Sequence, residues 1–322
     1  MTILRAIFIM TVALFFSACE QQSRETLKVG ISPWPGYEPL ALASEKGFFQ
    51  DTPVRIIRFA TPTESYRALR DGIIDVAAFT ADEVFHYAEV RDKPRIFLIL
   101  DISNGADAIV AKEEIKTIDD LKGKRLGVEG SALGDYVIQR ALDLSKNSLH
   151  VSQIQLKSVE INVQEKAFLN DEIDAAVTYE PSKSLLIKAG AHVLFDSSQI
   201  PYEIVDVLVT NDKTIEERSA DLENLAKGWF KSLHYINTNY QQMMHKMSQH
   251  EDTTVEEFQK GYEDLFIPTK AENLKMLGKN ASLLAPMQRL SKLMHTKGSL
   301  EKSIDVKPLL DSRIINAIKE VE

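Results

Sequence analysis

Short apolar runs alternate with amphipathic stretches along most of the chain, and the alternation repeats itself. The run KVGI at residues 28–31 precedes a helical pattern over residues 40–48, and the run RLGV at residues 125–128 precedes one over residues 135–144. Short apolar runs between helical patterns are typical of strands in a largely parallel sheet. We therefore expect the segment that begins at residue 28 and the one that begins at residue 125 each to contain a strand, a loop, a helix, a strand, a helix and a short buried strand.

A second matched pair follows the first. LRDGIIDVAA at residues 69–78 is similar to LNDEIDAAV at residues 169–177, and the two matched pairs are offset by about 97 and 99 positions. Because order and spacing agree, the sequence predicts two α/β lobes built alike.

Two segments are expected to cross between the lobes. Residues 96–100, a polar turn and residues 108–110 form strand, turn and strand, and residues 204–209 form a returning strand. Two connections are the geometry of a hinge. The predicted division is a signal peptide at 1–18, the first lobe at 19–106, the second lobe at 107–205, and the return to the first lobe with the C-terminal helices at 206–322.

The C-terminal part has a helical pattern from residue 214 onward. Its apolar positions Trp229, Phe230, Leu233 and Ile236 fall on one helix face. We expect these helices to pack on the first lobe.

The N-terminus has the pattern of a secretory signal. Arg5 precedes an apolar run at residues 6–16, which ends in Ser17, Ala18 and Cys19. About eleven apolar residues are too few to cross a bilayer core of roughly 30 Å. Cys19, the one cysteine of the chain, stands where bacterial lipoproteins carry their acylated cysteine. We predict cleavage before Cys19, its lipidation, and a periplasmic location with a lipid anchor in a bacterial membrane; a plain signal peptide is the alternative.

Composition narrows the function classes. The formal net charge is −9 and the pI is about 5.4, which argues against a general affinity for nucleic acid. Beyond Cys19 there is no thiol, and the seven histidines have no evident nucleophile partner. We therefore predict a monomer that is not an enzyme, with no catalytic residues, cofactor or metal.

Four loops at strand ends are the candidate ligand site, because ligands bind beyond the carboxyl ends of strands in open α/β sheets. The first loop contributes Trp34 and Tyr37, the second Phe79, Thr80 and Asp82, the third Glu129 and Ser131, and the fourth Tyr179 and Glu180; the crossover adds Asn104 and Asp107, and the returning strand adds Asp206.

Aromatic and acidic side chains dominate these loops. Pro33 and Pro35 stiffen the loop that carries Trp34, whose ring presents a negative π face. Carboxylates beside aromatic rings favour a ligand with an amine, an amidine or a protonated ring nitrogen. The structural alternatives are that Trp34 packs in the core and that Thr80 or Asp82 only caps the next helix.

At these loops a family resemblance becomes specific. Residues 28–49, 69–78, 121–128 and 174–181 resemble, in the same order, solute-binding proteins for nitrate, aliphatic sulfonates, taurine and thiamine-pyrimidine precursors, and the likeness extends over roughly residues 27–210. The resemblance implies the type II periplasmic-binding fold, with Trp34, Tyr37, Thr80 and Tyr179 as ligand contacts. It also implies an ABC import system with permease and ATPase partners.

The acidic loops distinguish this chain from binders of simple anions. They favour a nitrogenous or zwitterionic solute that is taurine- or sulfonate-like, an amine or pyrimidine-like. Three alternatives stay open: an enzyme of the same fold, of the thiamine-pyrimidine or menaquinone-pathway type; a ligand sensor for a membrane receptor; and a copper site at Met243, Met244, His245, Met247 and His250. For the last, packing is the favoured interpretation.

Overall fold

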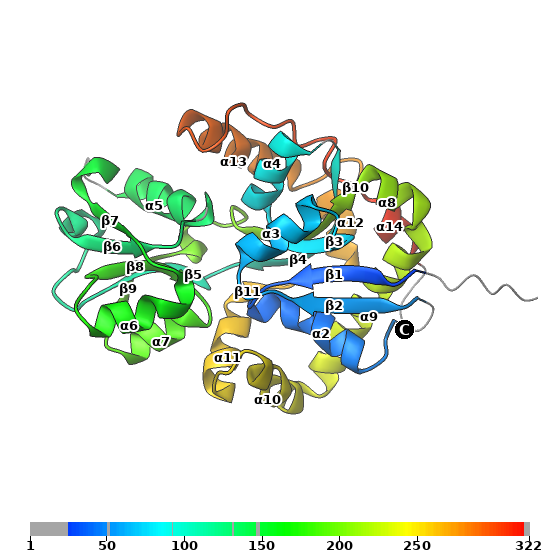
Figure 1. The fold of residues 1–322 in the computed structure, drawn as a ribbon, viewed down its shortest axis with the longest axis horizontal. Coiled ribbons are helices and arrows are strands. Elements are labelled where there is room, and N and C mark those ends of the chain that lie inside the picture. The colour runs from blue at the N-terminus through cyan, green and yellow to red at the C-terminus, as the bar shows by residue number, and fades with distance from the viewer. Residues whose placement is uncertain (1–24, 50–51, 92, 131, 146–148, 319–322) are drawn as a thin grey trace, which may run out of the picture.

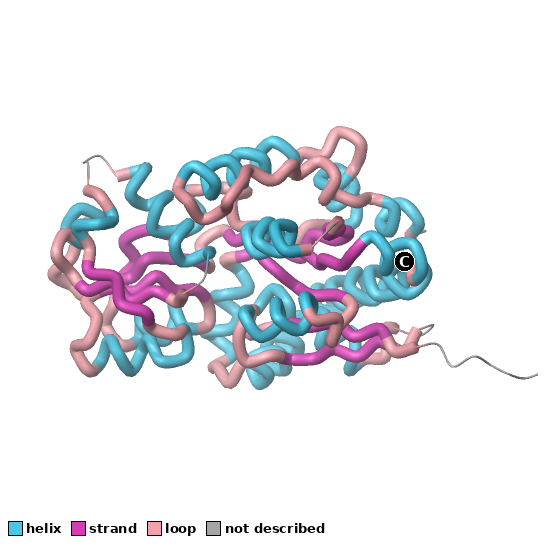
Figure 2. Tube along the Cα trace, turned by 45° about the horizontal axis from the view of Figure 1, so that its top comes forward, coloured by secondary structure: helices cyan, strands magenta, loops and turns pink. Residues whose placement is uncertain are grey.

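The computed structural model describes residues 25–49, 52–91, 93–130, 132–145 and 149–318. The predicted signal peptide, Cys19 and Ser131 lie outside the described residues. Two separate β-sheets organise the chain, and they lie side by side with helices around them (Figure 1 and Figure 2).

The first sheet has six strands. Their order is β11 (Leu265–Phe266), β4 (Pro94–Ser103), β10 (Val205–Asn211), β3 (Val76–Thr80), β1 (Leu27–Ile31) and β2 (Val54–Arg58). The second sheet has five strands, in the order β7 (Gln155–Ser158), β6 (Arg125–Val128), β8 (Ala175–Tyr179), β5 (Asp107–Ala111) and β9 (His192–Asp196).

The two sheets share one arrangement. Strand β1 pairs in parallel with β2 and β3, and β6 pairs in parallel with β7 and β8. On the far side of β3 and β8 the neighbouring strands, β10 and β5, are antiparallel. The predicted α/β fold with two matched halves is confirmed.

Helices connect the strands of each half. The first half contains α2 (Glu38–Glu45), α3 (Pro62–Arg70) and α4 (Ala81–Val90), and the second contains α5 (Ala132–Leu144), α6 (Gln164–Leu169) and α7 (Ser182–Lys188). Short 3-10 turns are η1 (Pro35–Tyr37), η2 (Ile118–Leu121), η3 (Val151–Gln153), η4 (Ile161–Val163) and η5 (Ser197–Gln199). In Figure 1, α5 lies on one face of the second sheet, and α6 and α7 lie on the other.

The C-terminal helices pack around the first sheet. They are α8 (Asp212–Glu217), α9 (Ser219–Thr238), α10 (Tyr240–His250), α11 (Val255–Glu263), α12 (Lys270–Leu277), α13 (Leu284–Thr296) and α14 (Arg313–Ala317). Helix α9 packs against α2, and α12 and α14 pack against β4. Trp229 and Ile236 are fully buried in this layer.

The methionines of α10 are packing residues in the structure. Met243, Met244 and Met247 are buried in one apolar cluster with Leu42 and Phe258. Nowhere in the described ranges is a helix long and apolar enough to cross a bilayer.

Two short segments join the sheets. Residues 104–106 lead from β4 to β5, and residues 197–204 lead from β9 back to β10. A Ser103–Ser197 hydroxyl contact of 2.7 Å ties the two crossings together, and the Gly105 N–H donates to the Ser197 hydroxyl at 2.7 Å. All five strands of the second sheet fall within residues 107–205, while the exact division into lobes stays a prediction.

An aspartate fixes the start of the first strand in each half. The Lys28 N–H donates to Asp75 Oδ2 at 2.8 Å, and the Arg125 N–H donates to Asp174 Oδ2 at 2.8 Å. Gly30 and Gly127 leave room beside them, since a Cβ there would lie 2.5 Å from Ile74 Cδ1 or 2.9 Å from Ile173 Cδ1. The two similar sequence segments therefore make equivalent contacts in the two halves.

The second aspartate also carries an ion pair. The Arg125 guanidinium donates to Asp174, with 2.6 Å between Nη2 and Oδ1, and this hydrogen bond is the main cause that lowers the pKa of Asp174 to about 2. Asp171 lies beside the same arginine but is largely exposed.

We expect Asp174→Asn to lower the free energy of unfolding by about 1–3 kcal/mol, because it weakens charge-assisted hydrogen bonds to a partly buried backbone. The matched variant Asp171→Asn, which suits a left-handed residue with φ 60°, should cost clearly less, because solvent screens the ion pairs of an exposed carboxylate. Urea denaturation at pH 7 measures both. Equal losses in the two variants would contradict the assigned role of Asp174.

Candidate functional site

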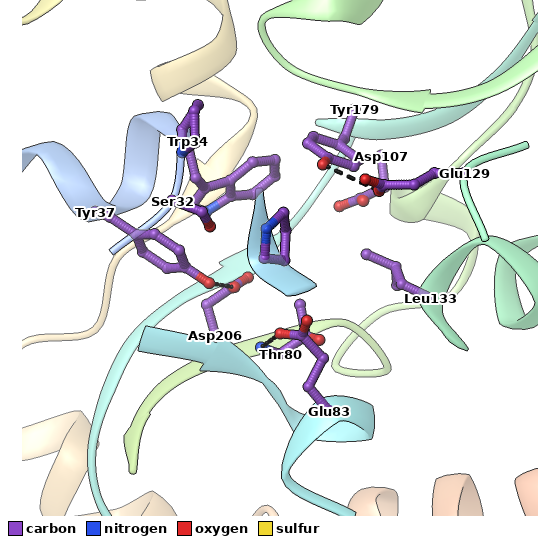
Figure 3. Close-up of a pocket in the computed structure, with 12 residues that line it drawn as sticks. Ser32, Trp34, Tyr37, Thr80, Glu83, Asp107, Glu129, Leu133, Tyr179 and Asp206 are labelled. Atoms are coloured by element: carbon purple, nitrogen blue, oxygen red, sulfur yellow. Dashed lines mark hydrogen bonds between the residues drawn. The ribbon is translucent and has the colours of Figure 1, made fainter. Parts of the chain in front are cut away.

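A cavity of about 40 Å³ lies where the loops of the two sheets meet. Figure 3 shows side chains from both sheets pointing into it. The lining residues are Ser32, Pro33, Trp34, Tyr37, Pro62, Thr80, Glu83, Asp107, Glu129, Leu133, Tyr179 and Asp206.

Strand ends position most of these side chains. Trp34 follows β1, Thr80 ends β3, Glu129 follows β6 and Tyr179 ends β8. Because β1 and β3 are matched by β6 and β8, the carboxyl ends of the two central parallel pairs point at one shared cavity.

An aromatic wall bridges the two sheets. The ring centroid of Trp34 lies 6.5 Å from that of Tyr37 and 6.0 Å from that of Tyr179, the latter in an edge-on arrangement at 72°. Such tilted pairs are favourable ring geometries. Trp34 therefore contacts the second sheet's aromatic ring while belonging to the first.

Buried acids hold this wall in place. The Trp34 indole N–H lies 3.1 and 3.3 Å from the two Asp101 oxygens, and the Tyr37 hydroxyl donates to Asp206. Gly36 allows the close approach, since a Cβ at that position would lie 1.9 Å from Asp101 Oδ2. The orientation of the wall thus depends on carboxyl groups behind it.

Four carboxyl groups line the cavity itself: Glu83, Asp107, Glu129 and Asp206. Burial raises the pKa of Glu83 to about 8 and that of Asp107 to about 7, and the charge of Asp82 adds to both effects. The twelve lining residues include no lysine, arginine or histidine. The cavity is therefore rich in acids without a basic counter-charge in its wall.

Two of these acids, Glu129 and Asp107, could accept a hydrogen bond from a ligand. Glu129 accepts a hydrogen bond from the Tyr179 hydroxyl at 3.3 Å, and burial raises its pKa. Asp107 Oδ2 is buried, and no hydrogen-bond partner exists for it among the described residues. A buried acceptor of this kind is the expected contact for an N–H group of a ligand.

The structure brings six of the predicted site residues together at the cavity. They are Trp34, Tyr37, Thr80, Asp107, Glu129 and Tyr179, and Asp206 of the returning strand joins them.

Four other predicted residues lie elsewhere. Phe79 is fully buried and stacks on Tyr66 at 5.9 Å, because side chains alternate along a strand and Thr80 takes the cavity face. Asn104 is exposed. Neither lines the cavity.

Asp82 and Glu180 are buried but do not line the cavity. Asp82 lies in the first turn of α4. Glu180 accepts from the Ser184 N–H at 3.1 Å, and the Lys183 ammonium lies 3.5 Å from its other oxygen. Glu180, predicted as a ligand contact, therefore does not line the cavity: one carboxyl oxygen accepts from its own helix and the other faces Lys183.

Sequence reasoning missed several lining residues, of which Glu83 is the most informative. Its carboxylate accepts from the Thr80 N–H at 3.0 Å, so the Thr-x-x-Glu spacing indicates a helix cap. Only the fold shows that the same carboxyl group borders a cavity. Pro62 and Leu133 carry no signal that separates them from ordinary helix starts.

Comparison with known proteins places this architecture. The Escherichia coli periplasmic aliphatic sulphonate binding protein SsuA superposes with a TM-score of 0.75 at 17% identity, over 91% of this chain and 100% of that one. The desulfurization enzyme DSZB superposes with a TM-score of 0.70 at 14% identity, over 91% and 98%. The chain therefore has the periplasmic-binding-protein fold.

The sequence comparison gives the family. The NMT1/THI5-like family model matches residues 34–243, so the chain belongs to that family. The resemblance inferred from the sequence is confirmed. A Brucella abortus protein named only as a proposed binding protein is 27% identical over 160 residues, which is 48% of each chain. The chain thus matches about half the length of such curated relatives.

The cavity acids predict how stability depends on pH. A carboxyl with a raised folded pKa stays protonated where the unfolded chain ionises, so its contribution to stability is full below about pH 4 and is lost as pH rises through about 7. Asp107→Asn removes this loss for one group. Relative to wild type, we expect the variant to gain on the order of 2 kcal/mol between pH 5 and pH 8.

Thermal or urea unfolding of the ligand-free protein at the two pH values measures the effect. Glu113→Gln, a change of the same charge at an exposed position, is the control and should show no such gain. A stability difference for Asp107→Asn that is the same at both pH values would contradict the raised pKa.

Proposed function

We propose that the protein is the solute-binding component of an ABC importer and captures a small cationic or zwitterionic organic solute that contains nitrogen. The observation that carries the proposal is the composition of the cavity wall. Three aromatic rings and four carboxyl groups surround one space between two sheets.

A positive charge is the complement that this wall lacks. The Trp34, Tyr37 and Tyr179 rings attract a cation through their π faces. Carboxylates form their strongest hydrogen bonds with charged N–H donors. Buried carboxylates are stable only when they are paired or protonated, so an ammonium, amidinium or protonated ring nitrogen would supply the missing partner.

The same wall disfavours a simple anion. A sulfonate in this cavity would lie among Glu83, Asp107, Glu129 and Asp206 without a basic residue in the lining. Once these carboxyl groups are ionised, they repel an anion strongly at short range in a poorly hydrated site. SsuA is named for sulphonates, but at 17% identity it supports the fold and not the ligand.

Binding would close the two sheets on the solute. The cavity is bounded by both sheets, and two short segments connect them. Closure around a ligand excludes water and strengthens each polar contact. A space of about 40 Å³ holds only a few water molecules, which favours a compact ligand. We propose binding without chemistry, because the lining contains no cysteine, histidine or lysine to act as a nucleophile.

The N-terminal pattern completes the proposal. We infer that Cys19 is acylated after cleavage of residues 1–18, that the mature protein faces the periplasm, and that it delivers its solute to a permease driven by an ATPase. Support comes from the apolar run and the Ser17-Ala18-Cys19 sequence.

We expect small organic cations to stabilise the protein. Tetramethylammonium, benzamidine and an aminopyrimidine should be compared with ethanesulfonate by thermal shift and calorimetry. A cation present at 100 times its dissociation constant adds about 2.7 kcal/mol to the free energy of unfolding. Affinity for tetramethylammonium should rise from pH 6 to pH 8, because the carboxyl groups must ionise to pair with it.

Variants locate the binding site. Asp107→Asn and Trp34→Ala should each weaken cation binding about tenfold or more, whereas Glu113→Gln should leave it unchanged. Stabilisation by ethanesulfonate alone, or unchanged affinity in both cavity variants, would refute the proposed ligand class.

The anchor has its own test. Expressed in Escherichia coli, the wild-type protein should incorporate labelled palmitate and sediment with membranes. Cys19→Ser should lose the label and appear in the soluble fraction. Label incorporation by Cys19→Ser would show that the lipid is attached elsewhere or that the pattern is not a lipoprotein signal.

A further inference from the structure

Two aspartates face each other behind the aromatic wall. Asp101 on β4 and Asp206 on β10 are directly paired in the antiparallel ladder of the first sheet. Asp101 is 0% exposed and Asp206 is 2% exposed. Only Asp206 lines the cavity, so one carboxyl of the pair can reach a ligand and the other lies in a second layer.

Neutral donors, and not cations, surround the pair. Asp101 receives the Trp34 indole N–H, and Asp206 receives the Tyr37 hydroxyl. Within the described ranges neither aspartate takes part in an ion pair. Two negative charges on the pair would therefore have no cationic partner among the described residues.

The remaining groups that act on the pair are acidic or neutral. When ionised, Glu83 on α4 adds negative potential at Asp206 and Asp107 on β5 adds it at both aspartates, and Tyr262 of α11 lies within electrostatic reach of Asp101. The phenol of Tyr262 is neutral at physiological pH, since burial raises its pKa further. Every ionised neighbour thus opposes a second negative charge on the pair.

Two carboxyl groups that share a poorly hydrated site do not ionise together at neutral pH. Burial raises the pKa of Asp101 to about 7, against the Trp34 hydrogen bond, which lowers it. Burial raises the pKa of Asp206 well above its ordinary value, and the charge of Asp101 adds to this. As a tightly coupled pair they are best described by the protons they hold together.

We propose that the Asp101–Asp206 pair holds a proton in the ligand-free protein and releases it to solvent when a cationic solute occupies the cavity. The release step rests on the proposed function, whereas the proton in the empty site does not. On release one O–H bond breaks, the proton passes to the buffer, and the solute's positive charge replaces it. The net charge of the cluster stays the same.

Asp101 is then a positioning residue for binding. It touches no ligand, but it orients Trp34 and sets how readily its neighbour Asp206 ionises. A neutral analogue of the solute cannot replace the proton's charge, so the pair would select for charge as well as shape. Below neutral pH, cation affinity would fall by up to about tenfold per pH unit for each proton released.

Titration of the ligand-free protein tests whether the Asp101–Asp206 pair holds a proton. Trp34 is one of two tryptophans in the chain, and its indole donates to Asp101, so its fluorescence should change as the pair ionises. We expect a fluorescence transition between about pH 6 and pH 8 in wild type. Glu83 and Asp107 also contribute to the infrared band of protonated carboxyl in this range, so the part of the band that Asp101→Asn removes is assigned to the pair. Asp101→Asn should abolish the fluorescence transition, and Trp34→Phe should remove the fluorescence signal while it keeps the infrared change.

Trp34→Phe provides a second, independent readout. Because the indole hydrogen bond lowers the pKa of Asp101, its removal should move the infrared transition to higher pH. A transition that is the same in wild type and Asp101→Asn, or one that Trp34→Phe moves to lower pH, would overturn the proposal. If Asp101→Asn does not fold, Asp206→Asn with the infrared readout serves in its place.

Calorimetry tests whether the pair releases its proton when a cation binds. Tetramethylammonium, which does not titrate, should be bound in two buffers of different ionisation enthalpy at pH 7. Wild type should release protons on binding, and Asp101→Asn should release fewer. Equal release by both would overturn the coupling. Absence of tetramethylammonium binding would count against the proposed function and the release step together, while the ligand-free titration still decides where the proton resides.

Discussion

The central constraint in this protein is the burial of several carboxyl groups in one poorly hydrated space without a basic residue in its wall. Such groups are stable when protonated, hydrogen-bonded to neutral donors, or paired with a charge from outside. The structure uses the first two: Trp34 and Tyr37 donate to Asp101 and Asp206, and burial raises the pKa values of Glu83 and Asp107. The third is what a cationic solute would provide.

The fold brings these acids together through its internal repeat. In each half an aspartate, Asp75 or Asp174, accepts a hydrogen bond from the backbone of the first strand. A glycine of that strand lies beside an isoleucine: Gly30 beside Ile74 and Gly127 beside Ile173. The strand ends of both halves therefore have matching positions, and the cavity forms where they meet. In the scaffold Asp174 is ionised and paired with Arg125, whereas the acids of the cavity have no basic residue in the lining.

Much of this was predictable from the sequence, and the reason is periodicity. The offset between residues 69–78 and 169–177 indicated two similar halves, and the strand-end rule then located Trp34, Tyr37, Thr80, Asp107, Glu129 and Tyr179. The rule fails at single-residue resolution. It cannot tell which of two adjacent residues faces the cavity, so Phe79 and Glu180 were grouped with their neighbours although they point the other way. Asp101 carried no signal either, because its importance lies in a cross-strand pairing that only the folded sheet creates.

Gly36 and Asp101 form one unit although they are far apart in the chain. The carboxyl oxygen of Asp101 occupies the volume in which any side chain at position 36 would begin. A side chain at position 36 therefore requires the Asp101 carboxyl group to move or to be lost. A descendant that replaced this glycine would have to shorten or lose the acid, and with it the support of the indole ring. Covariation between these two columns in a family alignment would then mark the subgroup that shares this ligand chemistry.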